Sequence, residues 1–187
     1  MAKEYPIIDE KISAWITRQK MFFVSTAPLS AEGKVNCSPK GMDTFRILDE
    51  KTVAYLDLTG SGVETIAHLK ENGRIVVMLC AFEGPPKIIR FHGKGEVLEV
   101  GTEDFEELLP QFDHLPGARS IIRIHVERIS DSCGYSVPLY SFEGERDVLT
   151  KWAEKKGEDG VAQYQKEKNT QSLDGLPGVS GSPSDPG

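Results

Sequence analysis

Residues 52–82 have the sequence TVAYLDLTGSGVETIAHLKENGRIVVMLCAF, and this stretch decides the fold. Its first seven residues predict a strand with Val53, Tyr55 and Asp57 on one face and Ala54, Leu56 and Leu58 on the other. The Thr-Gly-Ser-Gly segment breaks that strand, and the apolar spacing after it predicts a short helix that ends near Gly73. The final nine residues form a nearly unbroken apolar run, which predicts a strand buried on both faces.

The flanking segments extend this strand-rich pattern. Residues 21–27 and 34–38 flank a Glu-Gly turn and predict a hairpin, and residues 88–100 predict a long strand bent at a glycine. Residues 122–126 alternate and predict another half-buried strand. Apolar spacing and capping predict helices at residues 8–16, 102–109, 146–156 and 159–168. About six strands, most of them consecutive, predict a mainly β, α+β fold: a six-stranded antiparallel barrel with peripheral helices, although an open sheet satisfies the same pattern.

The bulk composition excludes several classes of partner. The 187 residues are 39% hydrophobic and 27% charged, which is typical of one globular domain. The net charge of -7 repels a polyphosphate backbone, so no nucleic acid partner is expected. The three cysteines, Cys37, Cys80 and Cys133, are far apart in the sequence, which indicates reduced thiols rather than a disulfide framework. No apolar run reaches the ~20 residues that a membrane helix needs. We therefore expect a cytoplasmic protein with no membrane partner.

Two turns carry groups that suit an anion. Residues 59–65 combine two glycines, Ser61 and Thr65 with a following helix N-terminus, although such strand-to-helix turns are also common without a ligand. Lys40 follows a proline at a predicted strand end, where its ammonium is either presented to a phosphate or solvated. Arg90 interrupts an apolar strand and faces either solvent or a site.

Other kinds of site find little support in the sequence. The four histidines lack the spacing of metal ligands, so no metal is expected. There is no G-x-S-x-G elbow, Walker A loop or G-x-G-x-x-G motif. Trp15, Trp152 and the phenylalanines are expected in the core rather than in a stacking platform.

The order of these motifs resembles the pyridoxamine 5'-phosphate oxidase family, in a less characterised branch. The resemblance covers residues 5–130 and is carried by SPKG at residues 38–41, YLD at residues 55–57, the glycine turn, and GPPKIIRFHG at residues 84–93. It implies an FMN-binding split β-barrel that works as a homodimer. Two later segments, residues 132–138 and 169–178, resemble the same branch.

The resemblance also implies roles for particular residues. Lys40 matches the family's lysine at the end of the second barrel strand, and the backbone of residues 55–57 matches the strand against the flavin ring. At Val63-Glu64-Thr65, the oxidases that give the family its name have Ser-Arg-Lys, so two phosphate-binding cations are missing here. The implied cofactor-binding residues are Ser38, Lys40, Gly41, Tyr55, Leu56, Asp57, Gly60, Ser61, Gly62, Val63, Thr65 and Arg90.

The resemblance predicts an FMN-dependent oxidoreductase of unknown substrate, with the phosphate held by Lys40, Ser61 and Thr65. No conventional catalytic dyad is expected, because the flavin itself transfers the electrons. The family's C-terminal arginine motif for pyridoxal phosphate is not found, so activity on pyridoxamine phosphate is not expected. The alternatives are a flavin carrier or sensor without turnover, and a deazaflavin- or haem-binding split barrel.

The chain is expected to divide into a split-barrel domain with C-terminal helices (residues 1–168), an ordered hook (residues 169–179) and a disordered tail (residues 180–187). The hook is favoured by its likeness to the family branch and by Leu173 and Leu176, which give it apolar groups to bury. A frayed terminus is the alternative. We expect the hook to pack near residues 132–138.

Overall fold

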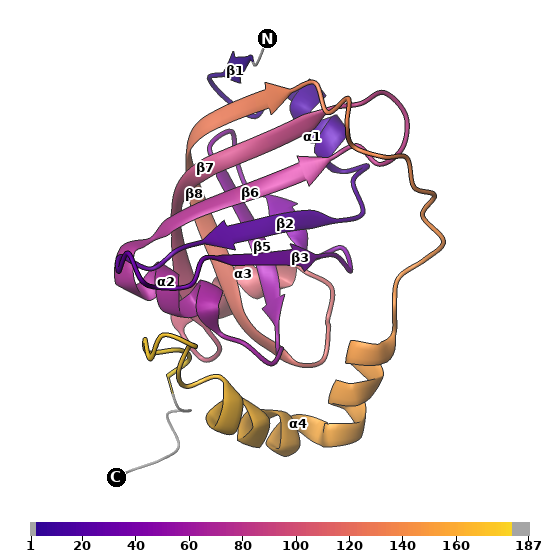
Figure 1. Cartoon of the computed structure of the whole chain (residues 1–187). Coiled ribbons are helices and arrows are strands. Elements are labelled where there is room, and N and C mark those ends of the chain that lie inside the picture. Colours follow the sequence, from indigo (N-terminus) through magenta and orange to yellow (C-terminus); the bar gives the residue numbers. More distant parts are fainter. Residues whose placement is uncertain (1–2, 181–187) are drawn as a thin grey trace.

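The structure, a computed structural model, describes residues 3–180. It is a mainly β, α+β fold in which one antiparallel sheet curls into a half-barrel with helices at its periphery (Figure 1), as predicted. The elements in chain order are β1 (Glu4–Tyr5), α1 (Glu10–Ile16), β2 (Phe22–Thr26), β3 (Asn36–Lys40), β4 (Phe45–Ile47), β5 (Thr52–Leu58), α2 (Glu64–Asn72), β6 (Arg74–Cys80), β7 (Ile88–Glu99), α3 (Glu103–Leu108), a 3-10 turn (Leu109–Gln111), β8 (Ala118–Ser132) and α4 (Val148–Lys168).

The sheet has eight strands within the described residues, two more than the six expected. Their order is β3-β2-β6-β7-β8-β5-β4, and β1 pairs separately with β8. The additional strands β1 and β4 have two and three residues, too short for an alternating pattern to show in the sequence. Because β3 and β4 end this order without pairing to each other, the barrel is split along a seam between β3 and the β4–β5 hairpin.

The core has two parts, one on each face of β5. Val53 and Tyr55 point into the main apolar cluster inside the half-barrel. Ala54 and Leu56 point the other way, into a smaller cluster with Phe105 of α3. This alternation is the one predicted for residues 52–58, and each fully buried aliphatic side chain stabilises the fold by roughly 1.5–3 kcal/mol.

The bend predicted in residues 88–100 lies at Gly93. The register between β7 and β8 shifts between His92 and Gly93, which marks a β-bulge. A Cβ atom at Gly93 would overlap the His125 carbonyl oxygen of β8. Glycine is therefore required here for the close approach of the two strands, not for a left-handed backbone.

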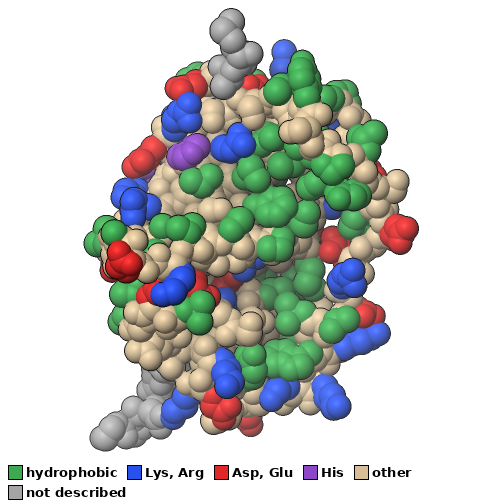
Figure 2. Space-filling view, viewed as in Figure 1, with side chains coloured by type: hydrophobic (Ala, Val, Ile, Leu, Met, Phe, Trp, Pro, Cys, Tyr) green, Lys and Arg blue, Asp and Glu red, His purple; other side chains and the backbone are tan. Residues whose placement is uncertain are grey.

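Strand β6 differs from its prediction, because it is not buried on both faces. Ile75, Val77 and Leu79 are buried, whereas Val76 and Met78 on the outer face are only half-buried. The reason is that no helix of the described chain covers the outside of β2 and β6, the face seen in Figure 2.

Residues 133–147, here called the strap, connect the end of β8 to α4 along one side of the molecule (Figure 1). The two helices predicted for residues 146–156 and 159–168 are joined as α4, which is interrupted at Gly157 by a left-handed φ of 69°. Within the described chain, no helix is both long and apolar enough to cross a bilayer.

Candidate functional site

Three charged side chains meet where β3, β5 and β8 converge at the seam. Asp57 lies near the end of β5, and its side chain is completely buried. Lys40, the last residue of β3, places its Nζ 2.8 Å from Asp57 Oδ1. Arg119, at the start of β8, donates from Nε to Asp57 Oδ2 at 2.7 Å. One carboxylate therefore faces two cations, and this Lys40–Asp57–Arg119 cluster carries one net positive charge.

The electrostatics of the cluster keep Asp57 ionised. Burial alone would raise the pKa of its carboxyl group, but the charges of Lys40 and Arg119 outweigh burial and hold that pKa below its ordinary value. Tyr55 lies two residues earlier on the same face, and its pKa is shifted upward. Burial and the negative charge of Asp57 raise the pKa of its phenol well above 10. Its hydroxyl stays protonated, and the Lys40 ammonium lies 5.8 Å from the centre of its ring.

Sequence reasoning missed Arg119, and a β-bulge explains why. Asp57 pairs with Ser120 and Leu58 pairs with Ala118, so β8 has one more residue than β5 at this point. The additional residue is Arg119. A bulge re-aims a side chain against the simple alternation of its strand, and here it turns Arg119 toward Asp57. The sequence signal is slight: an arginine two residues before the apolar run that begins at Ile121.

A row of polar side chains extends from the cluster along β3. Asn36, Ser38 and Lys40 occupy alternate positions on one face of this strand. Ser38 Oγ donates to Asn36 Oδ1 at 3.1 Å, and Asn36 Nδ2 donates to Thr65 Oγ1 of α2 at 2.9 Å. The structure thus brings together four of the predicted site residues, Ser38, Lys40, Asp57 and Thr65, at the free edge of the sheet.

The glycine turn is bonded to other segments of the chain through two of its carbonyl oxygens. Asn169 Nδ2 donates to the Gly60 carbonyl at 2.9 Å, and Arg119 Nη1 donates to the Gly62 carbonyl at 2.8 Å. Val63 is buried in the main core and contacts Gly178. Ser61 is exposed beside them. The turn thus presents carbonyl oxygens to donors of the chain, and the N-terminus of α2 begins with the carboxylate of Glu64.

The hook is the part of the chain that covers this turn. Glu64 Oε1 accepts from the Leu173 amide at 3.3 Å, and the Lys34 amide donates to Asp174 Oδ2 at 2.7 Å. Lys70 Nζ donates to the Gly178 carbonyl at 2.5 Å. The hook therefore packs on α2 and on the chain just before β3, not near residues 132–138 as expected. The predicted tail, apart from Ser180, which bonds to Glu99, lies outside the described residues.

Two other predicted residues, Leu56 and Arg90, lie apart from the polar row. The backbone of residues 55–57 was expected to face the flavin ring, yet Tyr55 is paired with both β4 and β8, and the Leu56 amide donates to the Thr44 carbonyl at 3.0 Å. The Leu56 side chain points into the smaller core cluster. Arg90 lies on β7, three strands from β3, where Nη1 donates to Ser132 Oγ at 2.9 Å.

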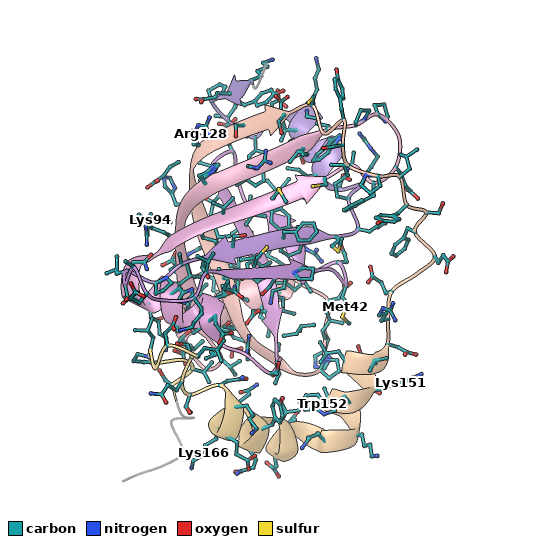
Figure 3. The ribbon with its side chains drawn as sticks, viewed as in Figure 1. Met42, Lys94, Arg128, Lys151, Trp152 and Lys166 are labelled. Atoms are coloured by element: carbon teal, nitrogen blue, oxygen red, sulfur yellow. The ribbon has the colours of Figure 1, made fainter. Side chains whose placement is uncertain are left out.

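A large cleft opens beside the cluster. It has a volume of about 1040 Å³ and lies between the barrel, the strap and the first half of α4. Lys40 and Gly41 form part of its wall, and most of its surface is apolar. Figure 2 shows the hollow, and Figure 3 shows Met42 on the barrel side and Trp152 on the α4 side. Trp152, expected in the core, lines this cleft instead. Trp15 packs against the main core cluster, as expected, and also lines the cleft.

Neither a metal site nor a histidine ligand accompanies the cleft. Within residues 3–180, no three His, Cys, Asp or Glu side chains are grouped closely enough to hold a metal ion. None of the four histidines, all of which the structure describes, lines the cleft. His68 is buried between α2 and β2, where burial lowers the pKa of its imidazole.

Comparison with known proteins gives a consistent set of similarities. The family model for pyridoxamine 5'-phosphate oxidase matches residues 8–133. The pyridoxamine 5'-phosphate oxidase family protein ustO of Aspergillus flavus is 37% identical over 194 residues, covering 94% of this chain and 77% of that protein. The crystal structure of HupZ from Group A Streptococcus is 25% identical with a TM-score of 0.52, covering 72% of this chain and 99% of HupZ. A Lactobacillus delbrueckii protein proposed to be a pyridoxamine 5'-phosphate oxidase has the same TM-score at 15% identity, covering 68% of this chain and 98% of its own.

Proposed function

The chain belongs to the pyridoxamine 5'-phosphate oxidase family, and on this premise we propose that it binds FMN and acts as a flavin-dependent oxidoreductase. The observation that carries the proposal is the Lys40–Asp57–Arg119 cluster, with its net positive charge, at the free edge of β3. An unbalanced cation beside the free edge of a sheet suits a planar ligand that carries an anionic group.

The residues fit such a cofactor at the polar row rather than at the glycine turn. Lys40 keeps 21% of its side chain exposed, so its ammonium can reach a ligand while it stays paired with Asp57. Ser38 and Thr65 add hydroxyl groups along the same row. The turn at residues 60–63 adds no positive charge and is covered by the hook. The anion-binding capacity that the family places in that turn is therefore assigned here to Lys40, supported by the buried Arg119.

Each part of the proposed site has a separate role. Bound FMN would supply the electron-transfer chemistry. Asp57 holds Lys40 in one position, and Arg119 balances the carboxylate so that Lys40 retains charge for the ligand. Among the described strands, none pairs with the outer edge of β3, which gives a planar ring access to backbone groups.

The absorption spectrum of the purified protein tests the proposal. After incubation with FMN and desalting, we expect a flavin band at about one FMN per chain. A colourless protein would refute flavin binding, and a deazaflavin or Soret band would replace FMN by one of the alternatives. Oxidation of NADH or NADPH by the holoprotein would then separate an oxidoreductase from a flavin carrier or sensor.

We also propose that the chain works as a homodimer. The outer face of β2 and β6 presents Phe23, Val76 and Met78, which are half-buried in one chain and lie side by side in the β2–β6 register. A two-fold related copy of the same face is the simplest cover for them.

A further inference from the structure

The carboxylates of the cleft are already engaged in holding the strap. Glu83 Oε1 accepts from the Phe142 amide of the strap at 3.0 Å. Glu145, itself on the strap, accepts from the Met42 amide of the barrel at 3.3 Å. These are the two acidic residues that line the cleft, and each has one oxygen committed to a backbone donor that fixes the strap over the barrel.

The cations of the cleft outnumber these carboxylates and are less engaged. Five line it, namely Arg18, Lys20, Lys40, Lys87 and Arg146. Lys40 pairs with Asp57, and Lys87 lies 3.9 Å from Asp131. Lys20 and Arg146 form no ion pair with any carboxylate in the described part of the chain. The cleft is therefore locally positive, although the chain as a whole has a net charge of -7.

The apolar part of the wall is aromatic. Trp15 and Phe82 contribute from the barrel side, Phe142 from the strap and Trp152 from α4. The Lys20 ammonium lies 5.5 Å from the centre of the Phe142 ring, so positive charge and aromatic surface are adjacent. At about 1040 Å³ the cleft is at the upper end of the size range of small-molecule sites.

We infer that this cleft is a binding site for a flat aromatic anion, a molecule with a fused-ring body and a carboxylate or sulfonate group. The ring body packs between the aromatic side chains of the barrel and those of the strap and α4, and the anionic group faces Lys20 and Arg146. The inference goes beyond the proposed flavin site, which lies along β3. Because the cleft shares Lys40 and Gly41 with that site, its occupant would be the substrate that the flavin meets, and this last step alone rests on the proposed function.

Two fluorescent probes that differ in charge test the inference. Anilinonaphthalene sulfonate carries the anion, whereas phenylnaphthylamine has a similar aromatic body without it. We expect the sulfonate to bind more tightly to the native protein. Lys20→Gln and Arg146→Gln should each weaken the sulfonate roughly three- to tenfold and leave the neutral probe unchanged. Phe142→Ala should weaken both probes, since it removes aromatic wall.

Lys11→Gln is the matched control, because Lys11 is an exposed cation of α1 outside the cleft and its loss changes the net charge by the same amount. Every variant is first checked for the native urea transition. The inference fails if Lys20→Gln and Arg146→Gln behave like Lys11→Gln, or if the neutral probe binds as tightly as the sulfonate. It also fails if probe affinity falls as the protein self-associates, because a second copy then fills the cleft.

FMN titrated alone and together with the sulfonate separates this inference from the proposed function. Charge-dependent probe binding without FMN binding would keep the cleft site and reject the flavin. FMN binding without charge-dependent probe binding would keep the proposed flavin site and reject the cleft as a binding site for an aromatic anion. If saturating FMN displaces the sulfonate, the cleft is the flavin's own site and a second ligand is excluded.

Discussion

Replacing Asp57 by asparagine removes the negative charge of the cluster while it keeps the size of the side chain. Lys40 and the buried Arg119 would then face each other without a counter-ion. Removing one partner of a buried ion pair costs about 3–5 kcal/mol, a large share of the roughly 5–15 kcal/mol that stabilises a domain. We therefore expect the free energy of unfolding of Asp57→Asn to fall by about 3–5 kcal/mol.

Urea unfolding followed by tryptophan fluorescence measures this difference, provided that the slope against urea is unchanged. Asp104→Asn is the control, since it removes a carboxylate that pairs with Arg123 while 55% exposed, and such exposed pairs contribute about 0–1 kcal/mol. The pH dependence supplies a second check. The pKa of Asp57 is lowered in the fold, so its contribution is complete above the ordinary value of 3.8 and is lost as the pH falls through the lowered one.

The gap between native and Asp57→Asn proteins should accordingly stay constant down to about pH 5 and shrink below about pH 4. A variant as stable as Asp104→Asn at neutral pH would refute the cluster as described. The same substitution raises the net charge of the cluster, so FMN should gain affinity relative to riboflavin even as the fold weakens. A loss of that selectivity would contradict the role given to the cluster charge.

Three further predictions follow from packing. Gly93→Ala should lower the free energy of unfolding in urea by about 1–3 kcal/mol, because its Cβ would overlap the His125 carbonyl. Gly60→Ala has open space around its Cβ and should change that free energy by less than about 0.5 kcal/mol. Equal effects of the two substitutions would contradict the bulge. A chain that stops after Lys168 should melt lower than one that stops after Ser180, with about 1 kcal/mol from the Asn169–Gly60 hydrogen bond alone, and identical melting curves would show the hook to be dispensable. Sedimentation at micromolar concentration should give a dimer that Met78→Lys converts to monomer, and a native monomer would exclude the proposed face.

Much of the fold was predictable because local patterns agree with the tertiary structure. Tyr55 and Leu56 alternate between two core clusters as the strand pattern requires. The Thr102 side chain caps α3, as predicted from a good N-cap residue that is followed by acidic residues. Gly73 ends α2 with a left-handed φ of 70°. In each case the residues that decide the structure are near neighbours in the chain.

The site was less predictable because it depends on contacts between distant segments. Arg119 reaches Asp57 only through a bulge, which alternation cannot reveal. The glycine turn has the composition of an anion cradle. In the structure its Gly60 carbonyl accepts a hydrogen bond from Asn169, which lies 109 residues further along the chain. Trp152 was expected in the core because its side chain is large and apolar, yet it faces a cleft that forms only when α4 packs across from α1.

The affinity of FMN compared with that of riboflavin measures how strongly the protein holds the phosphate. Riboflavin carries the same ring without the phosphate, so the ratio of the two affinities isolates the anionic group. Lys40→Gln should weaken FMN by about 1–3 kcal/mol and leave riboflavin nearly unchanged, while Lys11→Gln alters neither. If Lys40→Gln weakens both flavins equally, or if the native protein binds riboflavin as tightly as FMN, Lys40 does not hold the phosphate and the proposed site is wrong.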